Sequence, residues 1–425
     1  MNTNSPVTRR TFLAAAAGAP LVAGSLASAS FLQDKQEMKV ALIGCGGRGN
    51  GALKDAMEAA KINGLSMTLV ATADWFKDRA EGTGKEYGLD PAQCYGGAEA
   101  YKKVCESDAD VILMATAPLF RPIHFRAAIE AGKHVFMEKP VAVDPVGCRH
   151  IIETGEMAKQ KKLSVVAGTQ RRHQAPYLAQ KAMLDEGDLG AVRGGSVWWD
   201  QGQLWYKERN DGESEADYLI RNWVNFMEMN GDMIAEQHVH NIDVALWFVG
   251  RPPQSAMGYG ARHRRVTGNQ YDQFSTDFDF GEGVHIHSQC RQINGCANNV
   301  SEFLAYEKGE VWVARRAQMT GGEVMEPSMS TSDLHENPYV QEHVDLQRSI
   351  MNGDAVNEAE QVTNSCAAAI MGRIAAYTGE RVLWDDMMTN ADSELYNMQV
   401  ALKAEDFESG NVTLPEEGVA PVPGE

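Results

Sequence analysis

Three glycines follow a short apolar run early in the chain. Gly44, Gly46 and Gly49 fit the spacing G-x-G-x-x-G directly after residues 38–43. In such a turn the first glycine permits the bend, the second lets the backbone approach a pyrophosphate, and the third lets helix and strand pack closely. A second apolar run ends in Asp74, where a ribose-binding carboxylate is expected. The spacing predicts a dinucleotide site, and the acid favours NAD over NADP because it would repel a 2′-phosphate.

A second group of polar residues lies between Gly231 and Trp247. If this segment is one helix, Glu236, His240, Asp243 and Trp247 are spaced i, i+4, i+7 and i+11 and share a face. A carboxylate one turn before a histidine fixes the imidazole tautomer and stabilises its charge, as a general base near neutral pH requires. We therefore expect His240 to act as a base with Glu236 or Asp243 in support.

Two other interpretations of these histidines remain open. Glu236, His238 and His240 could lie on one face of a strand as three metal ligands, or the histidines could be structural. The apolar pattern of residues 239–248 favours a helix, which would turn His238 away from His240. We therefore expect no metal site.

Apolar runs that alternate with helical segments would position the glycine turn. After the first two runs, further ones cover residues 110–116, 134–137 and 163–168. Continuous apolar strands between helices indicate a parallel sheet that is covered on both faces. We predict an α/β fold in which residues 37–168 form a doubly wound Rossmann domain.

Several motifs resemble those of one known family. They are Met137-Glu138-Lys139-Pro140, Ala115-Thr116-Ala117-Pro118 with His124, Thr169-Gln170-Arg171-Arg172, and Gly372-Arg373-Ile374 near the C-terminus. Together they are similar to the glucose–fructose oxidoreductase, inositol dehydrogenase and rhizopine catabolism (Gfo/Idh/MocA) family. The resemblance covers nearly the whole chain beyond its N-terminal segment.

The resemblance implies roles for individual residues. It places Lys139 beside the nicotinamide ribose and the substrate, with Pro140 in a turn that fixes it; an ammonium group there can stabilise a hydroxyl that loses its proton. Where the family usually has Asp and Gly before the histidine, this chain has Glu236 and His238. Cofactor contacts are expected from Gly44, Gly46, Gly47, Arg48, Gly49, Asp74, Thr116, Pro118, His124, Glu138 and Lys139.

The strands change character after about residue 195. Residues 197–199, 274–280 and 311–313 alternate or cluster as strands of an open sheet do. We expect residues 169–350 to form an α+β substrate domain with an open, mainly antiparallel sheet. In the resembled family this sheet forms a substrate wall and often a subunit interface, which implies a homo-oligomer.

Substrate contacts and the C-terminal region complete the expected organisation. A helix within residues 355–385 would pack back on the Rossmann domain, and residues 411–425 would form a surface tail. Aromatic residues between Trp198 and Trp223 could stack on sugar rings, although such residues more often form cores. Substrate contacts are expected from Arg172, Asn222, Trp223, His238 and His240.

The first residues resemble a twin-arginine export signal. Thr8-Arg9-Arg10-Thr11-Phe12-Leu13 precedes an Ala-rich apolar run that ends near Ala27-Ser28-Ala29. The run spans about 15 residues, shorter than the roughly 20 of a membrane-spanning helix. We expect residues 1–29 to be removed and the protein to be periplasmic without a membrane span. An N-terminal anchor or an amphipathic tail is the other interpretation.

Composition excludes several classes of partner and site. The 39 Lys and Arg residues against 58 Asp and Glu give a net charge of −19, which disfavours nucleic acid because phosphate binding needs concentrated positive charge. The seven cysteines form no Cys-x-x-Cys pair, so neither a disulfide framework nor a zinc knuckle is indicated.

These patterns predict an exported NAD(P)-dependent oxidoreductase that acts on a hydroxyl of a sugar, polyol or glycoside. No nicotinamide pool is expected outside the cytoplasm, so the cofactor should be held tightly and recycled in place. One alternative is an NAD-dependent glycoside hydrolase or lyase that works through a transient keto-sugar. Another, of a different class, is a non-catalytic glycan-binding protein with structural NAD.

Overall fold

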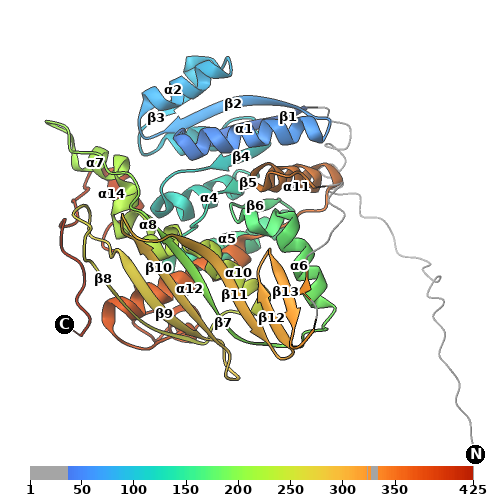
Figure 1. The fold of residues 1–425 in the computed structure, drawn as a ribbon. Coiled ribbons are helices and arrows are strands. Elements are labelled where there is room, and N and C mark those ends of the chain that lie inside the picture. Colours follow the sequence, from blue (N-terminus) through green and yellow to red (C-terminus); the bar gives the residue numbers. More distant parts are fainter. Residues whose placement is uncertain (1–36, 323, 327–333, 425) are drawn as a thin grey trace, which may run out of the picture.

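The computed structural model describes residues 37–322, 324–326 and 334–424, which form two sheets with helices around them (Figure 1). The expected export signal, residues 1–29, lies outside the described residues. Across the described part of the chain, no helix combines the length and apolarity needed to cross a membrane.

The first sheet has six strands in the order β3-β2-β1-β4-β5-β6, and all of its pairings are parallel. Its strands are β1 (Glu37–Ile43), β2 (Ser66–Asp74), β3 (Cys94–Gly96), β4 (Val111–Met114), β5 (His134–Met137) and β6 (Val165–Ala167). The strand order reverses beside β1, and open sheets bind ligands beyond the carboxyl ends of strands at such a point. This confirms the Rossmann prediction, with β3 as an additional three-residue strand.

Helices cover both faces of this sheet, and one of them comes from far along the chain. The local helices are α1 (Gly47–Ile62), α2 (Lys77–Glu86), α3 (Ala100–Cys105), α4 (Arg121–Glu130) and α5 (Pro145–Gln160). α11 (Pro338–Asn352) packs on α1, where Val340 and Val344 contact Ala59 and the Gln347 amide donates to the Ala56 carbonyl at 2.8 Å. Residues 338–350, which we expected in the substrate domain, therefore lie on the Rossmann domain.

The second sheet has nine strands in the order β14-β13-β12-β11-β7-β10-β9-β8-β15. They are β7 (Val192–Gln201), β8 (Ser255–Ala261), β9 (Gln273–Asp279), β10 (His285–Gln292), β11 (Asn299–Tyr306), β12 (Gly309–Trp312), β13 (Arg316–Met319), β14 (Val324–Met325) and β15 (Val382–Leu383). Only β7 and β10 pair in parallel among these described strands. The expected open and mainly antiparallel sheet is thus confirmed.

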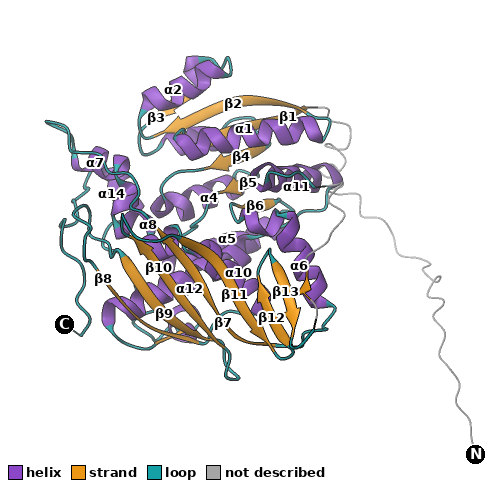
Figure 2. Ribbon diagram, viewed as in Figure 1, coloured by secondary structure: helices purple, strands orange, loops and turns teal. Residues whose placement is uncertain are grey.

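Besides α11, eight further α-helices follow β6 in the described part of the chain. They are α6 (Ala175–Asp185), α7 (Glu215–Arg221), α8 (Met227–Asn230), α9 (Met233–Glu236), α10 (Val239–Val249), α12 (Ala359–Thr378), α13 (Trp384–Met388) and α14 (Ala404–Ser409). α10 and α12 lie along one face of the nine-stranded sheet (Figure 2). α12 also contacts α5 of the Rossmann domain, so it joins the two domains.

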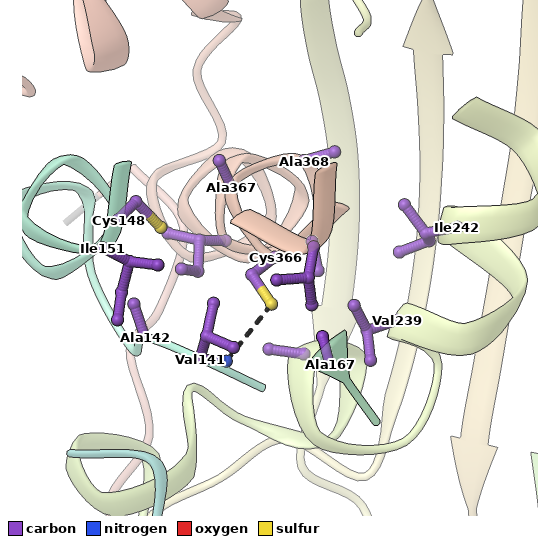
Figure 3. Packing of buried hydrophobic residues seen from close by; sticks show 14 of the residues in the cluster. Val141, Ala142, Cys148, Ile151, Ala167, Val239, Ile242, Cys366, Ala367 and Ala368 are labelled. Atoms are coloured by element: carbon purple, nitrogen blue, oxygen red, sulfur yellow. Dashed lines mark hydrogen bonds between the residues drawn. The ribbon is translucent and has the colours of Figure 1, made fainter. Parts of the chain in front are cut away.

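Small side chains allow this joint to be tight. Cys366, Ala367 and Ala368 of α12 are fully buried against residues that follow β5 and against α10 (Figure 3). The Val141 backbone N–H donates to the Cys366 sulfur at 3.4 Å. Buried residues of both domains therefore belong to one hydrophobic cluster.

The C-terminal segment is held to the second domain by specific bonds. Glu417 accepts hydrogen bonds from the Tyr218 hydroxyl at 2.8 Å and from the Gly268 backbone at 2.9 Å. The Tyr271 hydroxyl donates to the Pro421 carbonyl. Residues 411–424 form neither helix nor strand, yet they are fixed along the surface.

Candidate functional site

In the turn between β1 and α1, each glycine is required for a different geometric reason. Gly44 has φ +97°, and a Cβ there would lie 2.6 Å from the Ala115 carbonyl carbon. A Cβ on Gly49 would lie 1.7 Å from the Gly44 oxygen, whereas one on Gly46 would meet nothing within 4 Å. Open space over Gly46 and free N–H groups at the start of α1 fit a pyrophosphate.

A matched pair of substitutions tests this geometry. Gly46→Ala should leave stability nearly unchanged but weaken NADH binding, because the new methyl group fills the space that the pyrophosphate needs. Gly49→Ala should destabilise the fold by about 1–3 kcal/mol, because the methyl group overlaps the turn. Urea unfolding and NADH titration measure the two effects; equal loss of stability in both variants would contradict the assignment.

Asp74 ends β2 beside this turn. Its carboxylate accepts hydrogen bonds from the Cys45 backbone at 2.8 Å and from the Phe76 backbone at 2.9 Å. Burial raises the pKa of Asp74, and these two bonds oppose that rise. The carboxylate is therefore fixed at the edge of the turn, where a ribose would lie.

A cavity of about 110 Å³ brings several expected cofactor residues together. Gly44, Gly46, Asp74, Thr116 and His124 all line it. The His124 imidazole bonds the Thr116 hydroxyl at 3.2 Å, and burial lowers the pKa of His124 to about 3. His124 is therefore a neutral wall residue at ordinary pH.

The walls of this cavity also contain aromatic residues that the sequence did not reveal. Trp75, Tyr101 and Phe120 line it, and all three rest on α14. Phe407 packs edge-on against Trp75 and Phe120, with ring centroids 5.7 and 4.9 Å away, and Glu408 accepts from the Tyr101 hydroxyl at 2.9 Å. Only their positions after β2, β3 and β4 could have indicated them.

Four of the expected cofactor residues, Gly47, Arg48, Pro118 and Glu138, are not among the residues that line this cavity. Arg48 Nε lies 2.6 Å from the Glu138 carboxylate, and its guanidinium covers the Tyr339 ring at 4.8 Å. Gly47 begins α1, and Pro118 begins a short 3-10 turn, Pro118–Phe120. Arg48 and Glu138 thus tie the glycine turn to the end of β5, and direct cofactor contacts from these four residues stay a prediction.

Lys139 follows β5 and meets Glu236 from the second domain. The Lys139 ammonium lies 3.2 Å from the Glu236 carboxylate and also donates to the Glu236 backbone carbonyl. Both side chains are largely buried, with exposed fractions of 12% and 9%. The pair holds the ammonium at the boundary between the Rossmann domain and the substrate domain.

The expectation of one helix through residues 231–247 is wrong. α9 ends at Glu236, Gln237 has φ −107° and ψ −53°, and α10 begins at Val239. Glu236 and His240 therefore belong to two different helices, and Glu236 bonds Lys139. Neither these helices nor their connection forms a strand, so the arrangement for three metal ligands is also wrong, and no group of three potential ligands occurs among the described residues.

Asp243 pairs with Arg172 and not with His240. The guanidinium Nε and Nη2 of Arg172 contact both Asp243 oxygens at 2.9 to 3.1 Å, and the Ser365 hydroxyl donates to the same carboxylate at 2.7 Å. The expected support of His240 by Glu236 or Asp243 is therefore wrong, because each carboxylate is bonded to a cation of its own.

His240 is a nearly buried imidazole that packs on an aromatic ring. Its exposed fraction is 7%, and it stacks on Trp199 with ring centroids 5.6 Å apart. Burial, followed by the nearby positive charges of Lys139 and Arg171, lowers the pKa of His240 well below its ordinary value. The imidazole is therefore neutral near pH 7 and able to accept a proton.

Two models of one protein family match this chain. The Gfo/Idh/MocA model described as an oxidoreductase family with an NAD-binding Rossmann fold matches residues 38–168, and the Gfo/Idh/MocA C-terminal domain model matches residues 177–310. Together they cover more than half of the chain. The chain belongs to the Gfo/Idh/MocA family. Its first domain is accordingly an NAD-binding Rossmann domain.

Individual members of the Gfo/Idh/MocA family match over parts of the chain. The inositol 2-dehydrogenase of Klebsiella pneumoniae strain 342 is 33% identical over 154 residues, which are 36% of this chain and 43% of that relative. The one from Burkholderia cenocepacia is 28% identical over 59% of this chain and 66% of its own length. The aldose-aldose oxidoreductase of Caulobacter crescentus, 17% identical, shares the fold with a TM-score of 0.63 over 82% of this chain and 99% of its own.

Two expected substrate residues of this Gfo/Idh/MocA member are structural. His238 has no exposed surface, and its Nε2 lies 2.8 Å from the Ser288 hydroxyl. Asn222 is equally buried and bonds both the N–H and the carbonyl of Lys207. Their assignment as substrate contacts is wrong because neither presents a surface to a ligand. Trp223 instead lines the cavity next to the glycine turn that also contains Asp74 and His124, called the dinucleotide cavity below. Arg172 lies beside Asp243.

Proposed function

We propose that this protein is an exported NAD-dependent oxidoreductase that oxidises a hydroxyl-bearing carbon of a sugar, polyol or glycoside and keeps its cofactor between turnovers. The observation that carries the chemistry is the position of Lys139, anchored to Glu236, near a His240 that is held neutral. The two inositol 2-dehydrogenases reported above are named for a polyol and the aldose-aldose oxidoreductase for sugars. These names support a substrate of the same class.

Each side chain has a distinct task in this proposal. The neutral imidazole of His240 takes the proton of the substrate hydroxyl, and the ammonium of Lys139 stabilises the developing alkoxide. Glu236 fixes Lys139 by two bonds. NAD, when bound, supplies the hydride acceptor.

Arg172 and Asp243 define the side of the site next to α12. Their ion pair is fixed by Ser365, and the Arg172 guanidinium also covers the Trp247 ring at 4.9 Å. A guanidinium held in this way can donate to sugar hydroxyls without moving. We therefore keep Arg172 as a substrate contact and Asp243 as the residue that positions it.

Export would require the protein to retain its cofactor. The twin-arginine pattern of residues 9–10 implies a compartment without a nicotinamide pool, and the aromatic walls around the dinucleotide cavity would slow release. We also propose that copies of this chain associate through the open nine-stranded sheet.

Retention predicts that the protein carries its cofactor after purification. Native mass spectrometry of protein isolated from the export compartment should show one NAD(H) per chain. The Gly46→Ala variant, which blocks the pyrophosphate space, is the control that should lack this mass. Cofactor-free wild-type protein that turns over only with added NAD would contradict retention.

A substrate screen tests the reaction itself. Sugars, polyols and aryl glycosides should produce the absorbance of bound NADH, with no release of aglycone. Aglycone release without accumulation of NADH would contradict net oxidation and indicate transient oxidation with elimination. No NADH with any substrate, together with unchanged glycan binding in Lys139 and His240 variants, would contradict an enzymatic role.

A further inference from the structure

A groove runs from the glycine turn to a loop of the second domain. Its volume is about 370 Å³, and it is lined by Gly46 and Gly47 on one side and by Trp205 and Lys207 on the other. Arg79 of α2 also lines it. The loop, residues 202–210, thus lies over the start of α1, where the pyrophosphate of a dinucleotide is expected.

Residues 202–210 form neither helix nor strand, yet hydrogen bonds attach this loop to Asn222 and Asn225. Asn222 donates to the Lys207 carbonyl at 3.0 Å and accepts from the Lys207 N–H at 2.8 Å. Asn225 donates to the Trp205 carbonyl at 3.0 Å. Both asparagines have no exposed surface, and buried amides with satisfied bonds fix a backbone well.

Aromatic side chains of the loop are also fixed. Trp205 packs edge-on against Trp223 with ring centroids 5.9 Å apart, and the Tyr206 hydroxyl lies 3.2 Å from that of Tyr218. Three consecutive residues are therefore each attached to the segment 218–225. The loop forms a fixed rim over the groove.

Positive charge at this groove contrasts with the net charge of −19. Arg221 also lines the groove, but its charge is neutralised by Glu213 at 2.8 Å. Within the ranges that the structure describes, Lys207 forms no ion pair with a carboxylate. Arg79 also forms none within 4 Å in these ranges, although its charge opposes the rise in the pKa of Asp74. Lys207 and Arg79 thus bring two positive charges to the start of a helix, which favours an anion there.

We propose that Lys207 is a cofactor-binding residue, which the second domain places over the pyrophosphate of NAD, with Arg79 as the second cation. Asn222 positions Lys207 by holding both polar groups of its backbone. The proposal rests on the NAD-binding part of the proposed function and adds a contact from outside the Rossmann domain.

The pyrophosphate is the phosphate that the geometry favours. Gly46 and Gly47 line the groove together with Lys207, whereas Asp74, the expected ribose ligand, lines only the neighbouring cavity. A 2′-phosphate would lie on the ribose and next to the Asp74 carboxylate, which repels it. Lys207 should therefore act equally on NADH and NADPH.

The test compares Lys207→Gln with wild-type protein in two measurements. Titration with NADH, followed by energy transfer from tryptophan, should show an affinity about tenfold weaker, as expected for the loss of one charge-assisted hydrogen bond. Release of bound NADH after dilution should accelerate by a similar factor. Both differences should shrink as salt is raised, because an exposed charge is screened.

Two further variants complete the design. Lys308→Gln removes the same charge from an exposed turn of the same domain and should bind NADH like the wild type. Asn222→Ser should weaken NADH binding although Lys207 is intact, since the loop loses its anchor.

The outcomes separate this proposal from the proposed function. Equal weakening of NADH and NADPH by Lys207→Gln supports the pyrophosphate contact. Weakening of NADPH alone, or of neither nucleotide, overturns it. If wild-type protein binds NADH but oxidises no sugar, the proposed reaction fails while the binding test still decides the role of Lys207.

Discussion

Lys139→Met should lower kcat by about 10³-fold, the effect of removing one preorganised donor from a developing oxyanion. The methionine keeps the length of the side chain but removes the ammonium group. NADH binding should change much less, because the glycine turn and the cavity walls remain. Stopped-flow measurement of bound NADH formation, together with NADH titration, checks both parts of this expectation.

Structural damage must be separated from lost chemistry in this variant. Removing Lys139 leaves the Glu236 carboxylate, with 9% of its side chain exposed, without its cation, so a lower melting temperature is expected as well. The double variant Lys139→Met with Glu236→Gln removes this unpaired charge and should recover stability but not turnover. Recovery of turnover in the double variant, or a kcat within tenfold of wild type in Lys139→Met, would overturn the role of Lys139.

His240→Asn should lower kcat/KM for sugar oxidation by about 10²- to 10⁴-fold, the usual contribution of a general base. The wild-type pH profile provides a second readout. A base accepts a proton only while it is neutral, and it is neutral above its pKa. Because burial and nearby cations lower the pKa of His240, oxidation should stay constant as pH falls through 6.5 and decline only at lower pH.

The His240 variant should lose this acidic decline together with most of its activity. His150 on α5 is exposed, and His150→Asn makes the matched control with wild-type kinetics. A wild-type profile with its midpoint near pH 6.5, or the same profile in His240→Asn, would be incompatible with His240 as the base.

The Rossmann domain could be predicted from the sequence because its signals are local. Gly44, Gly46 and Gly49 lie within six residues, and each apolar strand is a continuous run that ends at the binding edge. Their spacing thus contains the geometry that the structure shows, including position 49, where a Cβ would lie only 1.7 Å from the Gly44 oxygen. Strand β3 was missed because its three residues, Cys94–Gly96, are too few for a periodic pattern.

The sequence predicted which residues belong to the candidate site, but it did not predict which of them form ion pairs with each other. Lys139, His240 and Asp243 could be named from the sequence as candidate catalytic residues, yet the partner of Lys139 lies 97 residues away and that of Asp243 lies 71 residues away. A helical pattern through residues 231–247 gave no sign of the break at Gln237. Only tertiary packing determines which carboxylate each cation meets.

The contacts of α14 have a consequence for the order in which the site is assembled. Trp75, Tyr101 and Phe120 rest on Phe407 and Glu408, which follow both sheets in the chain. The walls of the dinucleotide cavity therefore cannot be complete until both sheets and α14 have been synthesised. Retention of the cofactor should depend on α14, and a C-terminal truncation before residue 404 should yield a chain that never retains its nucleotide.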